Sequence, residues 1–239
     1  MNQRNTGIKI SSWLLVLAGM LFPLISFAQK SLEIGPAGGI AYYNGDITPG
    51  KPFVQPKPAF GILARYNVDN RWAVKVSITH GSLAGSDSIS KAVTNRNLSF
   101  NSTVNELAVT GEFNFWNYFT GSKREIFTPY LMGGGSFFIY DSQLSVGNST
   151  VPTYKSNSFA LIFGMGLKYS LSKKLGVGVE WGMRKTFTDY LDGVGTYIPN
   201  SSQQIQVGNN YKDWYNFTLV SLTYKIDLES GMNCNGLKW

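Results

Sequence analysis

Residues 175–184 read Leu175-Gly-Val-Gly-Val-Glu-Trp-Gly-Met-Arg184, with a large apolar side chain at every second position. The positions between them hold only Gly, Glu180 or Arg184. A period of two residues places alternate side chains on opposite faces of a β-strand. The segment therefore predicts a strand with one apolar face and one face of small and charged residues.

Seven further segments alternate in the same way: Leu32–Tyr42, Phe60–Asn67, Trp72–Thr79, Glu106–Phe115, Tyr130–Tyr140, Phe159–Tyr169 and Trp214–Ile226. Most are longer than the ~5–6 residues typical of soluble strands and match the ~9–11 that a tilted strand needs to cross a bilayer. Eight is an even number, as bacterial outer-membrane barrels require. We predict an all-β fold: an eight-stranded antiparallel transmembrane up-and-down β-barrel over residues 29–227. In the last segment the apolar phase changes between Leu219 and Val220, which predicts a β-bulge.

A secreted β-sandwich or a lipocalin-like barrel is the alternative, and the charged residues favour the membrane barrel. Four acids and five bases share the strand face that carries the small residues. This face is expected to point inward, because Lys or Arg facing lipid near the midplane costs ~2–4 kcal/mol. The interior of an eight-stranded barrel is just wide enough to be filled by side chains. We therefore predict a filled lumen without an ion pathway, containing a charge network of Glu33, Arg65, Lys75, Glu106, Glu112, Lys168, Glu180, Arg184 and Lys225.

The first 28 residues have the pattern of a secretory signal peptide. Arg4 and Lys9 precede an apolar run that ends in Ser26-Phe-Ala28. A membrane anchor is the rival reading, which the short run and Pro23 disfavour. Removal of the peptide lowers the number of basic residues from 21 to 19. With 14 acidic residues, the remaining chain has a net charge of 19 − 14 = +5. The charge is scattered along the chain, so it does not indicate nucleic-acid binding.

The connections between the predicted strands alternate between long and short. Residues 68–71 and 172–174 are short turns, and residues 116–127 are of intermediate length. Outer-membrane barrels have long external loops and short periplasmic turns, so both termini are expected in the periplasm, with a tail at 228–239. An inner aromatic girdle is expected from Trp72, Trp116, Tyr118, Phe119 and Trp214.

The sequence offers few groups for chemistry, since it has one His and one Cys. His80 and Ser82, with Asp87 as the acid, could be imagined as the triad of a lipid-A-modifying enzyme, but a histidine at the rim of the barrel is the preferred reading. The glycines at 133–135, 164 and 166 lack the strand–loop–helix context of a phosphate loop. No metal-ligand spacing appears, and we expect neither an enzyme nor a cofactor.

Cys234 follows the last predicted strand and is therefore expected on the oxidising periplasmic side. An unpaired cysteine in an exported protein indicates either a free thiol or an intermolecular disulfide. Both readings stay open, as does a chance cysteine without a role.

Several motifs together resemble a known family. They are Gly35-Pro-x-x-Gly39, Tyr43-x-Gly-Asp46, Phe127-x-Pro-Tyr130 and above all Glu180-Trp-Gly-Met-Arg-Lys-Thr-Phe-Thr-Asp-Tyr-Leu-Asp192. The chain is similar to the PorG-type barrel of the type IX secretion system of Bacteroidetes. Within the longest block, the residues that carry the likeness are Glu180, Trp181, Gly182, Arg184, Thr186, Phe187, Asp189 and Tyr190.

The resemblance implies a non-enzymatic outer-membrane protein that ties a periplasmic ring, made of a PorK-like lipoprotein and a PorN-like partner, to the membrane. The partners expected are therefore outer-membrane lipids and this ring. The periplasmic turns and the tail would supply the contacts, through Cys234, Lys123, Arg124, Lys173, Lys174, Asp69 and Arg71. Cys234 could form a disulfide with a ring subunit. The alternatives are a small adhesion or stress barrel that acts through its outer loops, or a lipid-A-modifying enzyme.

Overall fold

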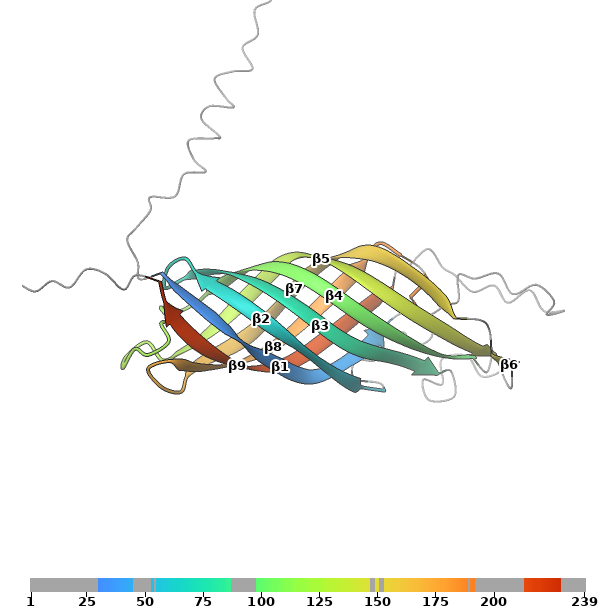
Figure 1. The fold of residues 1–239 in the computed structure, drawn as a ribbon, viewed down its shortest axis with the longest axis horizontal. Coiled ribbons are helices and arrows are strands. Elements are labelled where there is room, and N and C mark those ends of the chain that lie inside the picture. The colour runs from blue at the N-terminus through green and yellow to red at the C-terminus, as the bar shows by residue number, and fades with distance from the viewer. Residues whose placement is uncertain are drawn as a thin grey trace, which may run out of the picture.

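The computed structural model describes residues 30–44, 53, 55–86, 98–146, 149–150, 153–188, 190–191 and 213–228. The predicted signal peptide, Asp189 and most of the tail with Cys234 lie outside these residues. Figure 1 labels nine strands: β1 (Ser31–Asn44), β2 (Lys57–Asn67), β3 (Trp72–Ser86), β4 (Leu98–Asn114), β5 (Phe127–Val146), β6 (Ser149–Thr150), β7 (Tyr154–Ser170), β8 (Leu175–Thr186) and β9 (Trp214–Asp227).

Eight of these strands close into an antiparallel barrel. Around the wall they follow the order β4-β3-β2-β1-β9-β8-β7-β5, and pairing between β4 and β5 closes the ring. The two residues of β6 only extend the β5 edge beyond the barrel. The fold class predicted from the alternation is confirmed. Within the described residues, no helix has the length and apolar character needed to cross a membrane.

The outer surface of the barrel is apolar and the lumen holds the charges. Outward side chains such as Phe60, Ile62 and Phe159 are about 60% exposed, whereas the inward carboxylate of Glu112 is fully buried. In water this arrangement would be inverted, because ionised groups favour contact with solvent. An apolar belt on a closed barrel is the arrangement that a lipid environment requires, and the protein is an outer-membrane barrel.

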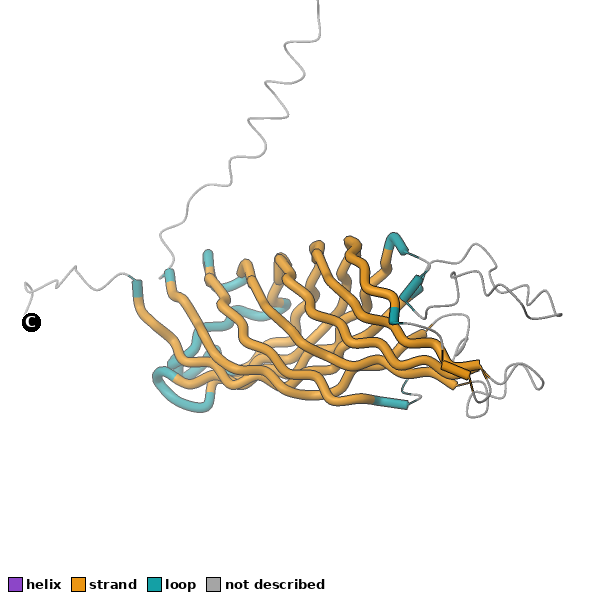
Figure 2. The backbone as a smooth tube through the Cα atoms, turned by 45° about the vertical axis from the view of Figure 1, so that its right-hand side comes forward, coloured by secondary structure: helices purple, strands orange, loops and turns teal. Residues whose placement is uncertain are grey.

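The strands are joined by few residues at one end of the barrel and by more at the other. Figure 2 draws the short loops in teal at the first of these ends. The turns 68–71 and 171–174, the connection 115–126 and the described chain ends at Lys30 and Leu228 all lie at one end. The longer connections lie at the other end. Short turns and termini mark the periplasmic side of such barrels.

Three details differ from the sequence predictions. First, β9 pairs with β8 in an unbroken register from Trp214 to Tyr224, so no bulge occurs at Leu219. The inward face simply changes from apolar residues to Ser and Thr. Second, β5 is 20 residues long and continues to Val146, beyond Tyr140, where the predicted segment ends. Third, Trp214 begins β9 at the external end and therefore does not belong to the inner girdle.

Candidate functional site

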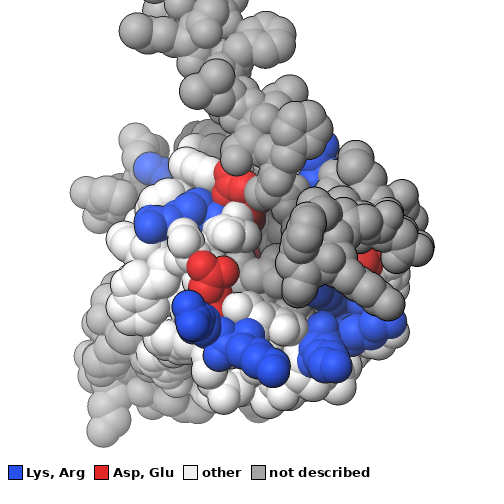
Figure 3. Space-filling view, turned by 90° about the vertical axis from the view of Figure 1, so that its left-hand side faces the viewer, with Lys and Arg blue, Asp and Glu red and all other residues white. Residues whose placement is uncertain are grey.

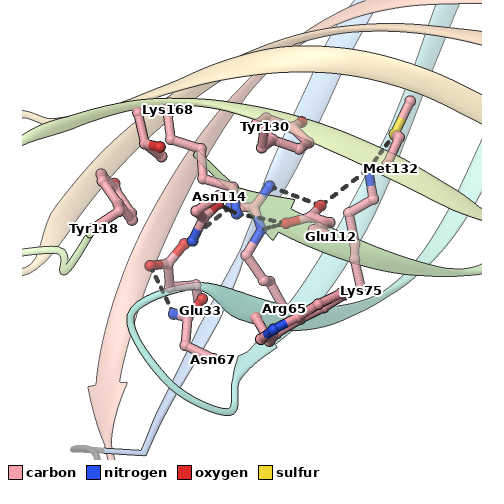
Figure 4. Close-up of polar contacts among 12 residues, drawn as sticks. Glu33, Arg65, Asn67, Lys75, Glu112, Asn114, Tyr118, Tyr130, Met132 and Lys168 are labelled. Carbon is pink, nitrogen blue, oxygen red and sulfur yellow. Dashed lines mark hydrogen bonds and ion pairs between the residues drawn. The ribbon is translucent and has the colours of Figure 1, made fainter. Parts of the chain in front are cut away.

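The periplasmic half of the lumen is organised around Arg65, which points inward from β2. Its Nε donates to Glu112 Oε2 at 2.8 Å, and its Nη1 donates to Glu33 Oε2 at 3.0 Å. All three side chains are at most 2% exposed. Figure 4 shows them meeting from three different strands, β1, β2 and β4. One guanidinium thus joins three strands by charge-assisted hydrogen bonds.

Two lysines complete the charge balance around Glu112. Lys168 Nζ lies 2.7 Å from Glu112 Oε2, and Lys75 Nζ lies 3.5 Å from Glu112 Oε1. Lys75 also forms an ion pair with Glu180, whose Oε2 accepts a hydrogen bond from the Tyr130 hydroxyl at 3.0 Å. This inner network, defined as Glu33, Arg65, Lys75, Glu112, Lys168 and Glu180, contains three acids and three bases. Its net charge is zero, so the buried ions compensate one another.

The external half of the lumen is filled mainly by aromatic and aliphatic side chains. A separate ion pair, Arg184 Nη2 with Glu106 Oε1 at 3.2 Å, marks the boundary between the two halves. Tyr215 donates to Glu106 as well, and the Arg184 guanidinium stacks 4.6 Å from the Phe217 ring centre. Around and beyond this pair lies a core that includes Tyr43, Leu83, Phe100, Val104, Phe138, Tyr140, Leu144, Leu191, Tyr215 and Phe217.

Leu191, which follows β8, and Asp213, which precedes β9, cover part of the external mouth. Leu191 is fully buried in the apolar core, and its backbone N–H donates to Asp213 Oδ2 at 3.0 Å. Asp213 also accepts a hydrogen bond from the Tyr43 hydroxyl. The Thr186 hydroxyl donates to the Asp213 carbonyl oxygen at 2.7 Å. Thr186 and Leu191 are thus both bonded to Asp213, and we call these three residues the external cap.

The periplasmic mouth is covered in a different way, by the connection 115–126. Thr120 enters the lumen and donates to Glu33 Oε1 at 2.6 Å. Because this bond uses the only hydroxyl hydrogen of Thr120, the Tyr118 hydroxyl is the donor in its 3.1 Å bond to Thr120. Burial, helped by the charge of Glu33, raises the pKa of Tyr118 to about 12, so Tyr118 stays protonated at neutral pH.

Gly121 explains why this cap can lie so close to the neighbouring turn. Its φ of 96° belongs to the left-handed region, and a Cβ atom there would lie 2.4 Å from the Lys173 carbonyl oxygen. Its N–H donates to Ser170 Oγ at 2.8 Å. The connection 115–126 is thereby bonded to the end of β7 and packed against the turn 171–174.

Arg71 binds the same connection to the third periplasmic segment. Its Nε donates to Asn117 Oδ1 and its Nη1 to the Phe115 carbonyl oxygen, both at 2.9 Å. Asp69 Oδ1 accepts hydrogen bonds from the backbone N–H groups of Arg71 and Trp72, which shapes the turn. The segments 68–71, 115–126 and 171–174 therefore form one ordered surface, which we call the periplasmic platform.

The periplasmic platform is basic. Its described residues include five bases and two acids, a net charge of 5 − 2 = +3. Lys123, Arg124, Lys173 and Lys174 are exposed, whereas the acids Asp69 and Glu125 are only partly exposed. Figure 3 views this end of the barrel and shows Lys and Arg side chains gathered around its rim.

The predicted site residues thus separate into three groups. All nine predicted lumenal charges are buried, although Lys225 pairs with Asp227 at 3.1 Å at the periplasmic edge and lies outside the inner network. Asp69 and Arg71 mainly hold the platform together, and the four exposed cations cover it. Cys234 and Asp189 fall outside the described residues, so the structure does not place them.

The predicted family block runs from the inner network to the external cap. Glu180 belongs to the network, Arg184 to the boundary ion pair and Thr186 to the cap. The Trp181 indole N–H donates to the Tyr42 hydroxyl at 2.6 Å, and the Tyr190 ring lies 6.0 Å from Tyr154. Gly182 supplies its carbonyl oxygen to Arg184, and Phe187 is exposed at the external end.

The residues considered for an enzyme do not form a catalytic arrangement in the described part of the chain. His80 Nδ1 lies 2.8 Å from Asn105 Oδ1, and the His80 ring packs 5.0 Å from Phe60. Its ring partner is thus an amide, where a triad requires a nucleophile and a carboxylate. Asp87 is outside the described residues. No cluster of three or more His, Cys, Asp or Glu side chains suited to a metal occurs among the residues described.

Sequence reasoning missed the residues that close the lumen. Tyr118 was expected in the girdle but points inward, and Thr120, Leu191 and Asp213 were not singled out. These residues lie in connections, where the two-residue period that marks strand residues is absent. Gly121, between polar residues in a short connection, was the one local signal of a tight turn.

Comparison with known proteins gives a family and a fold. A family model described as "Domain of unknown function (DUF6089)" matches residues 12–235. Among proteins with curated descriptions, none matches the sequence.

Several solved structures are similar to this chain at low sequence identity. A major outer membrane protein from Thermus thermophilus is 12% identical with a TM-score of 0.50, over 82% of this chain and 99% of that one. The N-terminal β-barrel domain of Pseudomonas aeruginosa OprF is 8% identical with a TM-score of 0.44, over 83% and 98%. Ail of Yersinia pestis is 11% identical with a TM-score of 0.44, over 84% and 100%. The Thermus likeness supports the barrel fold.

Proposed function

Because the chain belongs to the DUF6089 family and folds as an outer-membrane barrel, we propose that it is a non-enzymatic, PorG-type component of the type IX protein secretion machinery. In this role it anchors a periplasmic ring, formed by a PorK-like lipoprotein and a PorN-like partner, to the outer membrane. The periplasmic turns and the tail make the contacts.

The observation that carries this proposal is the ordered, basic periplasmic platform. Twelve residues that served only to join two strands could form an irregular loop. Here residues 115–126 are hydrogen-bonded to Arg71 of one neighbouring turn and to Ser170 at the end of β7. A surface whose shape is fixed before binding loses less conformational entropy when it docks a partner. Its net positive charge favours a partner with an acidic face.

The filled lumen supports an anchoring role over a channel role. The inner network, the apolar core and the two caps place buried side chains in both halves of the lumen. A transporter or pore of this size would need a continuous polar path, as wider barrels have. With the lumen filled, the surfaces available for work are the two ends and the lipid-facing wall.

Cys234 has a place in the same proposal. In the tail it would stand on the periplasmic side, where a disulfide with a ring subunit would reinforce the noncovalent contacts. A strain carrying Cys234→Ser that keeps normal ring attachment and normal export would remove the disulfide from the proposal and leave the platform contacts in place.

The proposal is tested by mild-detergent pull-down of the tagged protein from native outer membranes, without reductant, followed by mass spectrometry. We expect recovery of the ring lipoprotein and its partner, with the disulfide-linked fraction released by reductant. Replacement of Lys123, Arg124, Lys173 and Lys174 by Glu is expected to abolish the noncovalent recovery and to reduce export. Like charges that meet at an interface disfavour binding.

A matched charge change at the external end is the control. Lys57, Lys155 and Lys185 are exposed bases remote from the periplasmic platform. Their replacement by Glu changes the net charge in the same direction and is expected to leave ring recovery unchanged. Recovery of the barrel alone from wild-type membranes would contradict the proposal.

A second candidate function acts through the external end. Strands β4, β5 and β7 have 17, 20 and 17 residues, so this part of the wall extends farther than β2, which has 11. Such an extension suits an adhesion barrel that contacts partners outside the cell. Deletion of residues 147–153 would then abolish adhesion, whereas the anchoring role predicts normal protein export in the same strain.

A further inference from the structure

The lipid-facing wall contains a hollow of about 790 Å³ over strands β1, β2 and β3. Most of its lining residues have outward side chains. The lining residues used below are Ile34, Pro36, Ile62, Ala64, Val76 and Tyr224. The hollow is lined almost wholly by apolar groups and lies on the face of the wall that meets lipid.

Small side chains create the hollow. Pro36 and Ala64 project outward between the larger side chains of Ile34, Ile62 and Val76. Pro36 has no backbone N–H, and the register between β1 and β9 skips Gly35 and Pro36. Pro36 and Ala64 are smaller than their neighbours and leave the space that the larger apolar side chains border.

The hollow lies in the periplasmic half of the membrane. Ile34 is the fourth residue of β1, Ala64 is the fourth from the end of β2, and Val76 is the fifth of β3. All are counted from the periplasmic ends of these strands. A tilted strand advances roughly 2.5 Å per residue along the barrel axis, which places these residues roughly 10 Å from the periplasmic boundary of a band about 25 Å tall. The hollow therefore faces the periplasmic leaflet and extends to about the middle of the membrane at Ile62 and Ile78.

A cationic group stands at the periplasmic edge of the hollow. The Tyr224 ring forms part of the lining, and Lys174 Nζ lies 5.7 Å from the centre of that ring. Lys174 itself is exposed in the turn 171–174. The acid nearby, Asp227, is neutralised by Lys225 at 3.1 Å. An anionic group that follows hydrocarbon into the hollow would thus meet a positive charge at the level of the lipid headgroups.

We propose that this hollow binds an acyl chain of an anionic phospholipid of the periplasmic leaflet, with the lipid phosphate beside Lys174. A chain within the hollow contacts protein on several sides, whereas a chain on the convex belt contacts it along one side, so more dispersion contact is made. A basic residue near the membrane surface adds attraction for an anionic headgroup. The site does not depend on the anchoring role proposed above.

A phospholipid suits the hollow better than a second copy of this chain. The outer wall of another barrel is convex and rigid, so it makes little contact inside a hollow. An acyl chain is narrow and flexible, and the volume falls in the range of ordinary ligand sites. Lys174 supplies the charge complementarity that a purely apolar contact between barrels would lack.

Native mass spectrometry of the delipidated full-length protein tests the proposal, with phosphatidylglycerol and phosphatidylethanolamine of identical chains as the two probes. We expect the wild type to retain phosphatidylglycerol about fivefold more strongly than phosphatidylethanolamine, which is the effect of one basic residue at the membrane surface. Lys174→Ala is expected to bring this ratio to about one. Ala64→Leu fills the hollow and is expected to lower the retention of both lipids.

Gly133→Leu is the matched control, since Gly133 faces outward on β5, remote from the hollow, and a Cβ there meets nothing closer than 3.9 Å. Folding of each variant is checked by its heat-dependent electrophoretic shift. If Ala64→Leu does not fold, Lys174→Ala in its exposed turn still decides the outcome through the lipid ratio. Equal retention of the two lipids by the wild type would overturn the proposal. So would a dimer signal that Ala64→Leu removes, which would assign the hollow to a second copy.

Discussion

The Arg65 guanidinium lies between two carboxylates, with Nη1 3.0 Å from Glu33 Oε2 and Nε 2.8 Å from Glu112 Oε2. All three groups are almost completely shielded from solvent. Burial of an ion costs free energy unless it has a partner of opposite charge. Removal of any one of these three side chains would therefore destabilise the barrel. The balance of three acids and three bases in the inner network follows from that requirement.

Glu112→Gln is expected to lower the free energy of unfolding by about 3–5 kcal/mol, since Arg65, Lys75 and Lys168 would lose their shared carboxylate. Urea unfolding of the barrel in lipid vesicles measures the change. Lys155→Gln is the control, because the Lys155 and Asp141 side chains are 71% and 41% exposed and lie 3.8 Å apart. It is expected to cost under about 1 kcal/mol. Equal losses in the two variants would argue against a stabilising inner network.

Gly121→Val is expected to release the periplasmic cap from the turn 171–174. A β-branched residue at a φ of 96° is strained by about 1–2 kcal/mol or more, and its Cβ would approach the Lys173 carbonyl oxygen. Trypsin should then cut after Lys123 and Arg124 about 5–30-fold faster, because the population of the open cap rises.

Gly111→Ala is the control for this experiment, as Gly111 faces outward and a Cβ there meets nothing closer than 3.8 Å. Its cleavage rate should equal that of the wild type. If Gly121→Val were cut at the wild-type rate as well, the cap would not depend on the left-handed conformation of Gly121.

The wild-type barrel is expected to show no steady ion conductance in planar bilayers, because side chains fill both halves of its lumen. Tyr118→Ala is expected to stay closed too. The substitution removes a side chain from the periplasmic mouth only, while Leu191, Phe138 and Tyr215 still fill the external half of the lumen. Steady conductance in Tyr118→Ala would show that the periplasmic cap alone closes the barrel.

Alternation along the strands was enough to predict the eight-stranded barrel and the inward direction of Glu33, Arg65 and Glu112. Side-chain direction in a strand depends on the parity of residue number, and parity is visible in a sequence. The same reasoning failed at Leu219, where an apolar inward face was mistaken for a phase change. The lumen has an apolar external half and a charged periplasmic half, so hydrophobicity does not report direction along the whole strand.

Parity gave no information about the connections. Tyr118 and Thr120 enter the lumen because Gly121 turns the chain and because Glu33 offers an acceptor 87 positions away in sequence. Trp214 was placed at the wrong end because an aromatic residue at a strand terminus suits either membrane interface. Contacts between segments that are distant in sequence decide both cases, and they become visible only in three dimensions.

Photo-crosslinking in living cells is the measurement that tests the anchoring role most directly. A photoreactive amino acid is placed at Lys123 on the periplasmic platform, and in a parallel strain at Asn157 on the external part of β7. The account predicts that position 123 crosslinks to the ring lipoprotein or its partner and that position 157 does not. No ring crosslink from position 123, in a strain where the barrel is folded and export is normal, would contradict it.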